Sequence, residues 1–239
     1  TILWSVALKH SCFQITSPSG TKTHRVGDAF VNDTSIFLLL PPHQDMARYL
    51  PQDLADKIAI IAQDFERKLY STGGNLSLSK CFWYLIDWVW DDDGTAKMRK
   101  INQGKAVVSL TQGKFSNTHI IKREEIDTAI RTIGVRVNPM GNHQIEYEHR
   151  LQYSTKWTNL IKNSKLTNYE VLRAYRTVFL PSISYPLGAI YFTPDQCSTL
   201  QNLAAQAYLP KLGFNRKLPK AILFGPTTYG GWGEKDLYI

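Results

Sequence analysis

The sequence predicts an α+β fold in which short antiparallel strands with one packed helix are followed by a mainly helical region. Two observations predict this fold. Runs of β-branched and aromatic residues, separated by glycine, proline and asparagine, recur up to about residue 145. Beyond that point apolar residues recur at helical spacing behind capping sequences. The 239 residues, 43% of them hydrophobic, suffice for a packed core, and we divide them into regions 1–145 and 146–239.

The first predicted element is a β-hairpin at about residues 22–40. Two apolar, β-prone runs flank Asn32-Asp33, and both of these residue types tolerate the backbone angles of a tight turn. A carboxylate at such a tip is held stiffly by two strands and can serve as a ligand for a hard divalent cation. The alternative is a surface turn in which Asp33 only satisfies the backbone. Pro41-Pro42 ends the second strand because proline cannot donate to a ladder.

An amphipathic helix is predicted over residues 45–71, either continuous or as two short helices that meet at Pro51. Gly73-Gly74 is typical of a helix C-terminus. The predicted apolar face, which would pack on a sheet, consists of Leu54, Ile58, Ile61, Phe65 and Leu69.

Short strands follow the helix. The aromatic run 82–90 predicts one strand that ends at Asp91-Asp92-Asp93-Gly94. This acidic run favours a hairpin turn over a calcium loop because its ligand spacing is compressed and no glutamate follows. Further short strands are expected over 96–122, with turns near Gly104 and Gly113. We interpret 122–125 as a solvated charged run, and 130–137 as a strand that turns back at 138–142.

The helical region contains two capping boxes. Thr167 with Glu170 precedes one apolar face, and Thr193 with Gln196 precedes another. Pro181 and Pro186 are expected to stop the first helix. The first face comprises Val171, Leu172, Tyr175, Val178 and Phe179, and the second comprises Leu200, Leu203, Ala204, Ala207 and Tyr208. The sequence 229–233 predicts a glycine-rich turn.

Charge is concentrated in the second half of the chain. Residues 1–120 hold 13 Lys and Arg against 11 Asp and Glu, whereas residues 121–239 hold 15 against 9. A polyanion is therefore expected to lie on the second half, although a net charge of +8 also suits simple solubility. Three widely separated cysteines and the lack of a long apolar run predict an intracellular protein with reduced thiols and no membrane partner.

The order of these motifs resembles the C-terminal part of a reverse transcriptase of the non-LTR, LINE-like retroelement class. A Phe-Val-x-Asp hairpin precedes an amphipathic helix, a Gly-Gly turn and the sequence Leu-x-Leu-Ser-Lys before an aromatic strand. Ile-Gly-Val-Arg-Val follows about 50 residues later, and a basic helical region ends in Tyr-Gly-Gly. The resemblance covers roughly residues 22–239. It implies that region 1–145 is the second part of a polymerase palm and that region 146–239 is a thumb.

The resemblance assigns the hairpin to catalysis. Phe30, Val31, Asn32 and Asp33 match the Phe/Tyr-x-Asp-Asp motif, whose first aspartate binds the catalytic Mg²⁺ ions. Asn32 replaces that aspartate and keeps one neutral oxygen without the charge, a severe loss for two-metal catalysis. Asp33 matches the second aspartate. The family's other catalytic aspartate lies upstream, and residues 1–21 lack it, so we expect this chain to be a piece of a longer polymerase that is inactive alone.

Other site residues follow from the resemblance and have plainer alternatives. Lys80 matches a lysine that acts near the phosphates of an incoming deoxynucleotide; otherwise it is a solvated lysine at a strand entry. Gly134 matches a hairpin that contacts the primer; otherwise it adjoins an ordinary turn. The thumb would hold the RNA template and DNA primer through contacts between basic side chains and phosphates. The alternative is that these side chains are plain surface charges. The candidates are Lys156, Lys162, Lys165, Arg173, Arg176, Lys211, Arg216, Lys217 and Lys220.

Two further interpretations remain open. Trp157, Tyr175 and Phe214 could stack on bases, although core packing is favoured for all three. The chain could also be a degenerate, non-catalytic relic that binds nucleic acid, which Asn32 favours, or an unrelated basic α+β domain. We find no phosphate loop, dinucleotide fingerprint or zinc motif.

Overall fold

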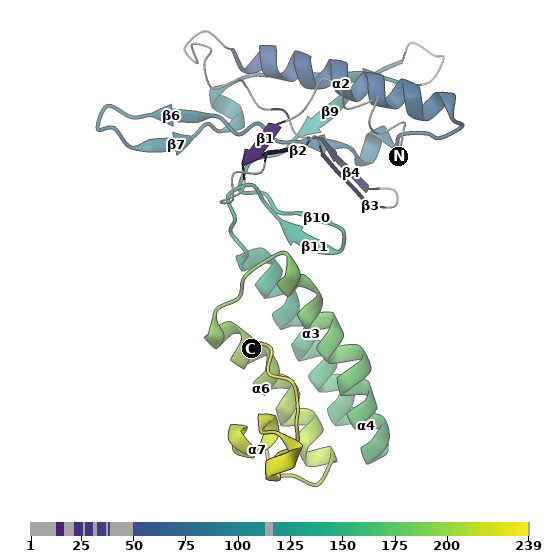
Figure 1. The fold of residues 1–239 in the computed structure, drawn as a ribbon, viewed down its shortest axis with the longest axis vertical. Helices are drawn as coiled ribbons and strands as arrows, with labels where there is room; N and C mark the ends of the chain where they lie inside the picture. The colour runs from purple at the N-terminus through teal and green to yellow at the C-terminus, as the bar shows by residue number, and fades with distance from the viewer. Residues whose placement is uncertain are drawn as a thin grey trace. The chain divides into compact units, whose positions relative to one another are not determined.

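The computed structural model describes residues 13–16, 22–25, 27–30, 33–36, 38, 50–112 and 117–238. The chain divides into two compact units, a strand-rich unit (residues 1–128) and a helical unit (residues 129–239). The predicted change of character near 145 therefore lies inside the helical unit, whose hairpin β10–β11 (Ile130–Thr132 and Val135–Val137) packs on helix α3. Figure 1 shows both units and labels most of their helices and strands.

The strand-rich unit begins with two hairpins. Strands β1 (Phe13–Thr16) and β2 (Lys22–Arg25) pair antiparallel, as do β3 (Gly27–Phe30) and β4 (Asp33–Ile36). The hairpin predicted at 22–40 is thus confirmed as β3–β4, whereas β1 was not predicted. Phe30 pairs with Asp33, so Asp33 belongs to β4 and not to the tip as predicted, whereas Val31 and Asn32 lie outside the described residues. Turn residues indicate that a turn exists, but strand pairing fixes the register.

Helix α2 (Pro51–Ser71) confirms the second part of the predicted helix and starts at its proline. Pro51 suits the first helical position because the N–H that it lacks would have no partner there. The C-terminus follows the Schellman pattern: Gly73 has φ +83°, its N–H donates to Tyr70 O at 3.0 Å, and the Gly74 N–H donates to Leu69 O at 3.0 Å. The expected closure by Gly73-Gly74 is therefore confirmed. Residues 41–49 lie outside the described part.

Helix α2 packs on a three-stranded sheet with strand order β5-β9-β8, formed by β5 (Phe82–Trp83), β8 (Val108–Thr111) and β9 (Thr118–Arg123). The helix also covers the edge of this sheet. The Gln52 carboxamide bonds both backbone groups of Val107 at 3.0 and 3.1 Å, and Gln63 bonds those of Thr111 at 2.7 and 2.8 Å. These two side chains therefore bond backbone groups at the sheet edge that would otherwise bond a further strand. Strand β5 runs parallel to β9, so this sheet is mixed and not antiparallel as predicted.

The aromatic run 82–90 forms two strands, so the prediction of one strand was wrong. After β5, strand β6 (Trp88–Trp90) pairs with β7 (Ala96–Met98) in a separate hairpin that projects from its unit (Figure 1). The hairpin turn predicted at Asp91–Gly94 is confirmed, with Gly94 at φ +81°.

The prediction that residues 122–125 form a solvated charged run is wrong for Arg123 and Glu125, which are partly buried. Arg123 donates to Gly104 O and lies over Trp83, and Glu125 accepts from the Ile101 N–H.

The helical unit packs α3 (Gln144–Asn163) against α6 (Pro194–Lys211), with α4 (Asn168–Ala174) beside α6. Both predicted capping boxes are confirmed. Pro181 does not stop the first helix, because π-helical residues Tyr175–Phe179 precede it and the path continues through α5 (Leu180–Ser184) to a 3₁₀ turn over Tyr185–Gly188. The wider π turn keeps Tyr175 and Phe179 buried while Val178 becomes exposed, contrary to its predicted burial.

The C-terminal segment returns along α6 after α7 (Lys220–Phe224) and the 3₁₀ turn Thr227–Tyr229. The Gln201 carboxamide holds the segment: it donates to Lys235 O at 2.9 Å and accepts from the Leu237 N–H at 3.3 Å. The predicted glycine-rich turn is confirmed, with Gly230 at φ +80°. Among the described helices, none combines the length and apolar character that crossing a membrane requires.

Candidate functional site

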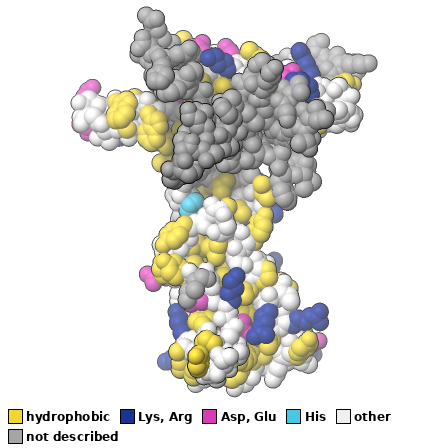
Figure 2. Space-filling view, in the orientation of Figure 1, with side chains coloured by type: hydrophobic (Ala, Val, Ile, Leu, Met, Phe, Trp, Pro, Cys, Tyr) yellow, Lys and Arg dark blue, Asp and Glu magenta, His cyan; other side chains and the backbone are white. Residues whose placement is uncertain are grey.

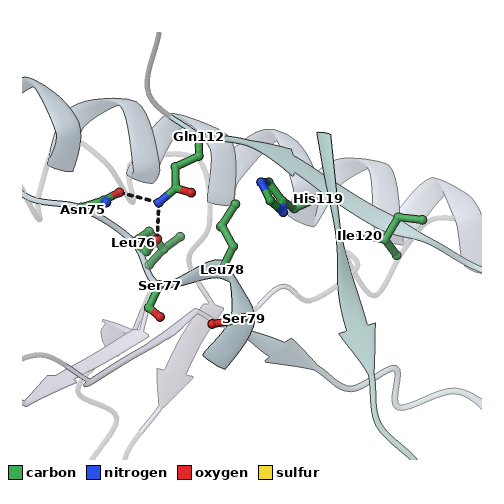
Figure 3. Close-up of a pocket in the computed structure, with 8 residues that line it drawn as sticks. All are labelled: Asn75, Leu76, Ser77, Leu78, Ser79, Gln112, His119 and Ile120. Carbon is green, nitrogen blue, oxygen red and sulfur yellow. Dashed lines mark hydrogen bonds between the residues drawn. The ribbon is translucent and has the colours of Figure 1, made fainter. Parts of the chain in front are cut away.

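A pocket of about 440 Å³ lies beside the Leu-x-Leu-Ser-Lys sequence in the strand-rich unit (Figure 3). Its lining combines residues 75–79 with Gln112, His119 and Ile120 from the hairpin β8–β9. Gln112 Nε2 donates to Asn75 Oδ1 at 2.6 Å and to Leu76 O at 2.9 Å, which joins the two walls. None of these eight residues carries a carboxylate. The hydroxyls, amides and imidazole in this lining suit a neutral or anionic polar ligand.

The local fold explains how Lys80 is placed next to this pocket. Residues Leu78–Lys80 form a 3₁₀ turn, and the Leu78 side chain is buried in the core between α2 and the sheet. Lys80 ends this turn and is exposed, and its ammonium makes no hydrogen bond or ion pair with any described residue. This placement leaves its ammonium available to an external anion. The pocket residues Gln112 and His119 were not predicted, because the pairing of β9 with β5, which are far apart in the sequence, brings them here.

The hairpin β3–β4 carries the residues assigned to metal binding. Phe30 ends β3 and Asp33 begins β4, but the side chains of both, and all of Val31 and Asn32, lie outside the described residues. Within the part of the chain that is described, no group of three His, Cys, Asp or Glu could hold a metal ion. In the sequence, the matched motif offers Mg²⁺ one carboxylate, that of Asp33, and the neutral amide of Asn32, which is less charge than two Mg²⁺ ions require.

Gly134 lies in the helical unit, at the turn of β10–β11, so residues 130–137 form a hairpin and not the single strand predicted. Ile133 (φ +50°) and Gly134 (φ +83°) both adopt left-handed angles, as a two-residue type I′ turn requires. A β-branched residue rarely adopts this conformation. Tyr185 stabilises the turn: its hydroxyl donates to Ile133 O at 2.6 Å, and its ring lies where a Gly134 Cβ would come within 3.3 Å.

A buried ionic network fixes the same hairpin to α3. The Glu146 carboxylate is fully buried and accepts from the Arg136 N–H at 2.9 Å and from Arg150 Nε at 2.6 Å. Arg150 also donates to Ser182 O at 3.0 Å and to Gly134 O at 3.4 Å. His149 lies nearby, and burial together with the Arg136 charge lowers its pKa. The i, i+4 spacing of Glu146 and Arg150 is the sequence signal that could have revealed this network.

Gly134→Ala is expected to destabilise the helical unit by about 1–2 kcal/mol, because a left-handed residue other than glycine costs that much and the Cβ also meets Tyr185. Gly141→Ala is the matched control. Gly141 has φ +68°, but a Cβ added there would meet no atom within 4 Å, so this variant isolates the backbone cost. Urea unfolding of both variants checks the prediction. A Gly134→Ala variant as stable as the wild type would contradict it.

The predicted nucleic-acid contacts separate into two groups. Three residues are engaged within the fold: Arg176 pairs with Glu234 at 2.5 Å, Lys211 donates to Ser164 O at 2.7 Å, and Lys220 donates to Ser198 Oγ at 2.7 Å. The others are exposed, and their ammonium or guanidinium groups make no hydrogen bond or ion pair with any described residue, namely Lys156, Lys162, Lys165, Arg173, Arg216 and Lys217. Figure 2 shows Lys and Arg side chains gathered on the helical unit.

The aromatic candidates of the helical unit belong mainly to its core, as favoured from the sequence. Trp157 and Tyr175 are 6% and 1% exposed, and their rings lie 6.1 Å apart. Burial raises the pKa of Tyr175 to about 12. Phe214 is 38% exposed and packs edge-on against Trp232 at 4.7 Å. Neither Trp157 nor Tyr175 is therefore available to stack on a base.

Comparison of the chain with protein-family models, with curated proteins and with solved structures gave no match.

Proposed function

We propose that this chain is a palm and thumb piece of a non-LTR reverse transcriptase that binds nucleic acid but does not polymerise alone. In the intact polymerase, two Mg²⁺ ions would join deoxynucleotides to a primer 3′-OH along an RNA template. The observation that carries the proposal is one arrangement in chain order. A hairpin whose second strand begins at Asp33 precedes a helix packed on a sheet, and a basic helical unit follows.

The exposed cations support the binding half of this proposal. Lys156 and Lys162 are on α3, Arg173 is on α4, and Arg216 and Lys217 lie between α6 and α7. Because these ammonium and guanidinium groups have no described partner, they can neutralise phosphates without first breaking an internal ion pair. Such contacts bind a duplex regardless of its sequence and release counterions, which makes the affinity depend on salt.

The test is a titration of the purified chain with an RNA–DNA duplex at several salt concentrations. We expect affinity to fall by about 10³-fold or more between about 50 and 200 mM salt if six or more phosphates are contacted. Arg216→Gln/Lys217→Gln should make the slope of log K against log salt shallower by up to about 2. Lys100→Gln/Lys105→Gln removes two exposed charges from the strand-rich unit and is the matched control. An affinity that does not change with salt would contradict the proposal.

A non-catalytic relic is the second candidate, and Asn32 favours it because an amide stands where the resemblance requires a metal-binding carboxylate. Primer extension with Mg²⁺ and deoxynucleotides tests whether the chain polymerises alone. We expect no extension by the wild-type chain or by Asn32→Asp, because both lack the second catalytic aspartate that the resemblance requires. The coding sequence upstream of Thr1 separates the two candidates: an open frame that carries a strand with a catalytic aspartate supports the polymerase piece, whereas a stop codon or unrelated sequence supports the relic.

A further inference from the structure

The hairpin β6–β7 exposes two tryptophans on a projection from the strand-rich unit. The Trp88 side chain is 51% exposed and that of Trp90 is 70% exposed. Tryptophan is mostly buried in folded proteins and is enriched at protein interfaces. Figure 2 shows hydrophobic side chains along this projecting hairpin. Neither residue takes part in the function proposed above.

Strand pairing places both rings on one face of the hairpin. Trp88 is opposite Met98 and Trp90 is opposite Ala96, and residues directly opposite each other in an antiparallel pair share a face. Val89 and Lys97 occupy the other face. Ala96 is too small to cover the ring opposite it, which explains why Trp90 is the more exposed. The result is one apolar surface made of Trp88, Trp90, Ala96 and Met98, which we call the Trp face.

Charge varies along the hairpin from its tip to its base. Asp92 and Asp93 at the tip are exposed and form no ion pair with any described residue. The Thr95 N–H donates to Asp93 at 2.9 Å, which lowers the pKa of that carboxyl and keeps it ionised. Asp91 is neutralised by Lys97, and Asp87 by Arg99. Lys100 at the base is exposed and has no acidic partner among the described residues. The tip is therefore negative and the base positive.

This distribution disfavours a single-stranded nucleic acid as the occupant of the Trp face. Bases can stack on tryptophan, but such sites need a cationic groove along the backbone. Asp92 and Asp93, which follow Trp90 closely in the chain, have no ionic partner among the described residues, and their carboxylates would repel phosphates. A protein surface that is positive opposite the tip and negative opposite the base is a better complement. A second copy of this hairpin presents that charge order when it runs in the opposite direction.

We propose that the Trp face docks on the Trp face of a second copy of this chain, with the two hairpins antiparallel about a two-fold axis. This arrangement stacks the four tryptophans and places Asp92 and Asp93 near Lys100 of the second copy. A two-fold interface of this kind is self-complementary and closed, so it forms a dimer and not a filament.

The size of the Trp face sets the strength of the dimer. A tryptophan that becomes fully buried removes about 150–250 Å² from water, and Trp88 and Trp90 are 51% and 70% exposed, so the four rings of the dimer bury roughly 350–600 Å². Stable interfaces bury about 1,200–2,000 Å² in total. The dimer should therefore be weak and reversible, with a dissociation constant in the micromolar range.

Sedimentation equilibrium of the full chain between about 1 and 200 μM tests the proposal. The average mass should rise from 27.2 kDa toward twice that value, and Trp88→Ala/Trp90→Ala should remain at 27.2 kDa with an unchanged circular dichroism spectrum. Tyr169→Ala, at a 71% exposed aromatic residue of the helical unit, should dimerise as the wild type does. A wild-type mass of 27.2 kDa throughout, or a double variant that still dimerises, would overturn the proposal.

A charge exchange tests the antiparallel arrangement separately. Asp92→Lys/Asp93→Lys keeps both tryptophans and should weaken the dimer by about fivefold. Adding Lys100→Glu should restore most of the lost affinity, because the charge order is then reversed as a whole. A triple variant weaker than the double variant would exclude this packing. Oligothymidine that binds the wild type but not Trp88→Ala/Trp90→Ala would instead assign the face to nucleic acid.

Discussion

Glu146→Gln is expected to lower the free energy of unfolding of the helical unit by about 3–5 kcal/mol. The carboxylate is fully buried and lies between the Arg136 N–H and the guanidinium of Arg150, which is itself only 8% exposed. Glutamine keeps the shape but removes the charge. The buried guanidinium would then lack its counter-ion, and loss of one partner of a buried ion pair costs more than the pair contributes.

Glu148→Gln is the matched control for this prediction. Glu148 is on the same helix two residues away, but it is exposed, and its carboxylate accepts a hydrogen bond from the Gln144 side chain at 3.0 Å and forms no ion pair with a described residue. Its loss should change stability by less than about 0.5 kcal/mol. Urea unfolding followed by circular dichroism compares the two variants. If Glu146→Gln unfolded within about 1 kcal/mol of the wild type, the network would not be what holds β10–β11 on α3.

The parts of the fold that could be predicted are those encoded by neighbouring residues. Thr167 with Glu170 and Thr193 with Gln196 mark helix starts because each pair satisfies backbone donors within one turn. Gly73 marks a helix end because its left-handed angle is needed there. In contrast, the division of residues 82–90 into β5 and β6 depends on pairing with β9 and β7, which lie farther along the chain.

The same distinction between local and long-range contacts explains which residues of the candidate site could be predicted. Lys80 and the hairpin containing Asp33 were identified from short motifs that resemble a polymerase. Gln112 and His119 reach the pocket beside Lys80 because β9 pairs with β5, which lies far from it in the sequence, so no local pattern marks them. Similarly, a lysine or arginine in the sequence does not show whether it is free. Arg176 is engaged by Glu234, 58 residues away, whereas the guanidinium of Arg173 on the preceding turn has no partner among the described residues.

Phe179→Ala is expected to destabilise the helical unit by about 3–5 kcal/mol, the usual cost of removing a buried phenylalanine ring. Phe179 is fully buried, with ring centroids of Trp157 at 4.7 Å and Tyr175 at 5.6 Å. These two rings are held by α3 and by the π-helical turn, so the cavity cannot collapse freely. The urea midpoint should fall while the dependence of the unfolding free energy on urea stays unchanged.

Val178→Ala tests whether the π-helical turn sets this burial. Val178 precedes Phe179 and is 50% exposed, whereas apolar residues spaced for a regular α-helix would bury both. Truncation of Val178 should therefore change stability by less than about 0.5 kcal/mol. A cost for Val178→Ala similar to that for Phe179→Ala would show that the helix keeps its regular register up to Pro181. The missing proline donor and its ring would then have to be accommodated without the wider turn.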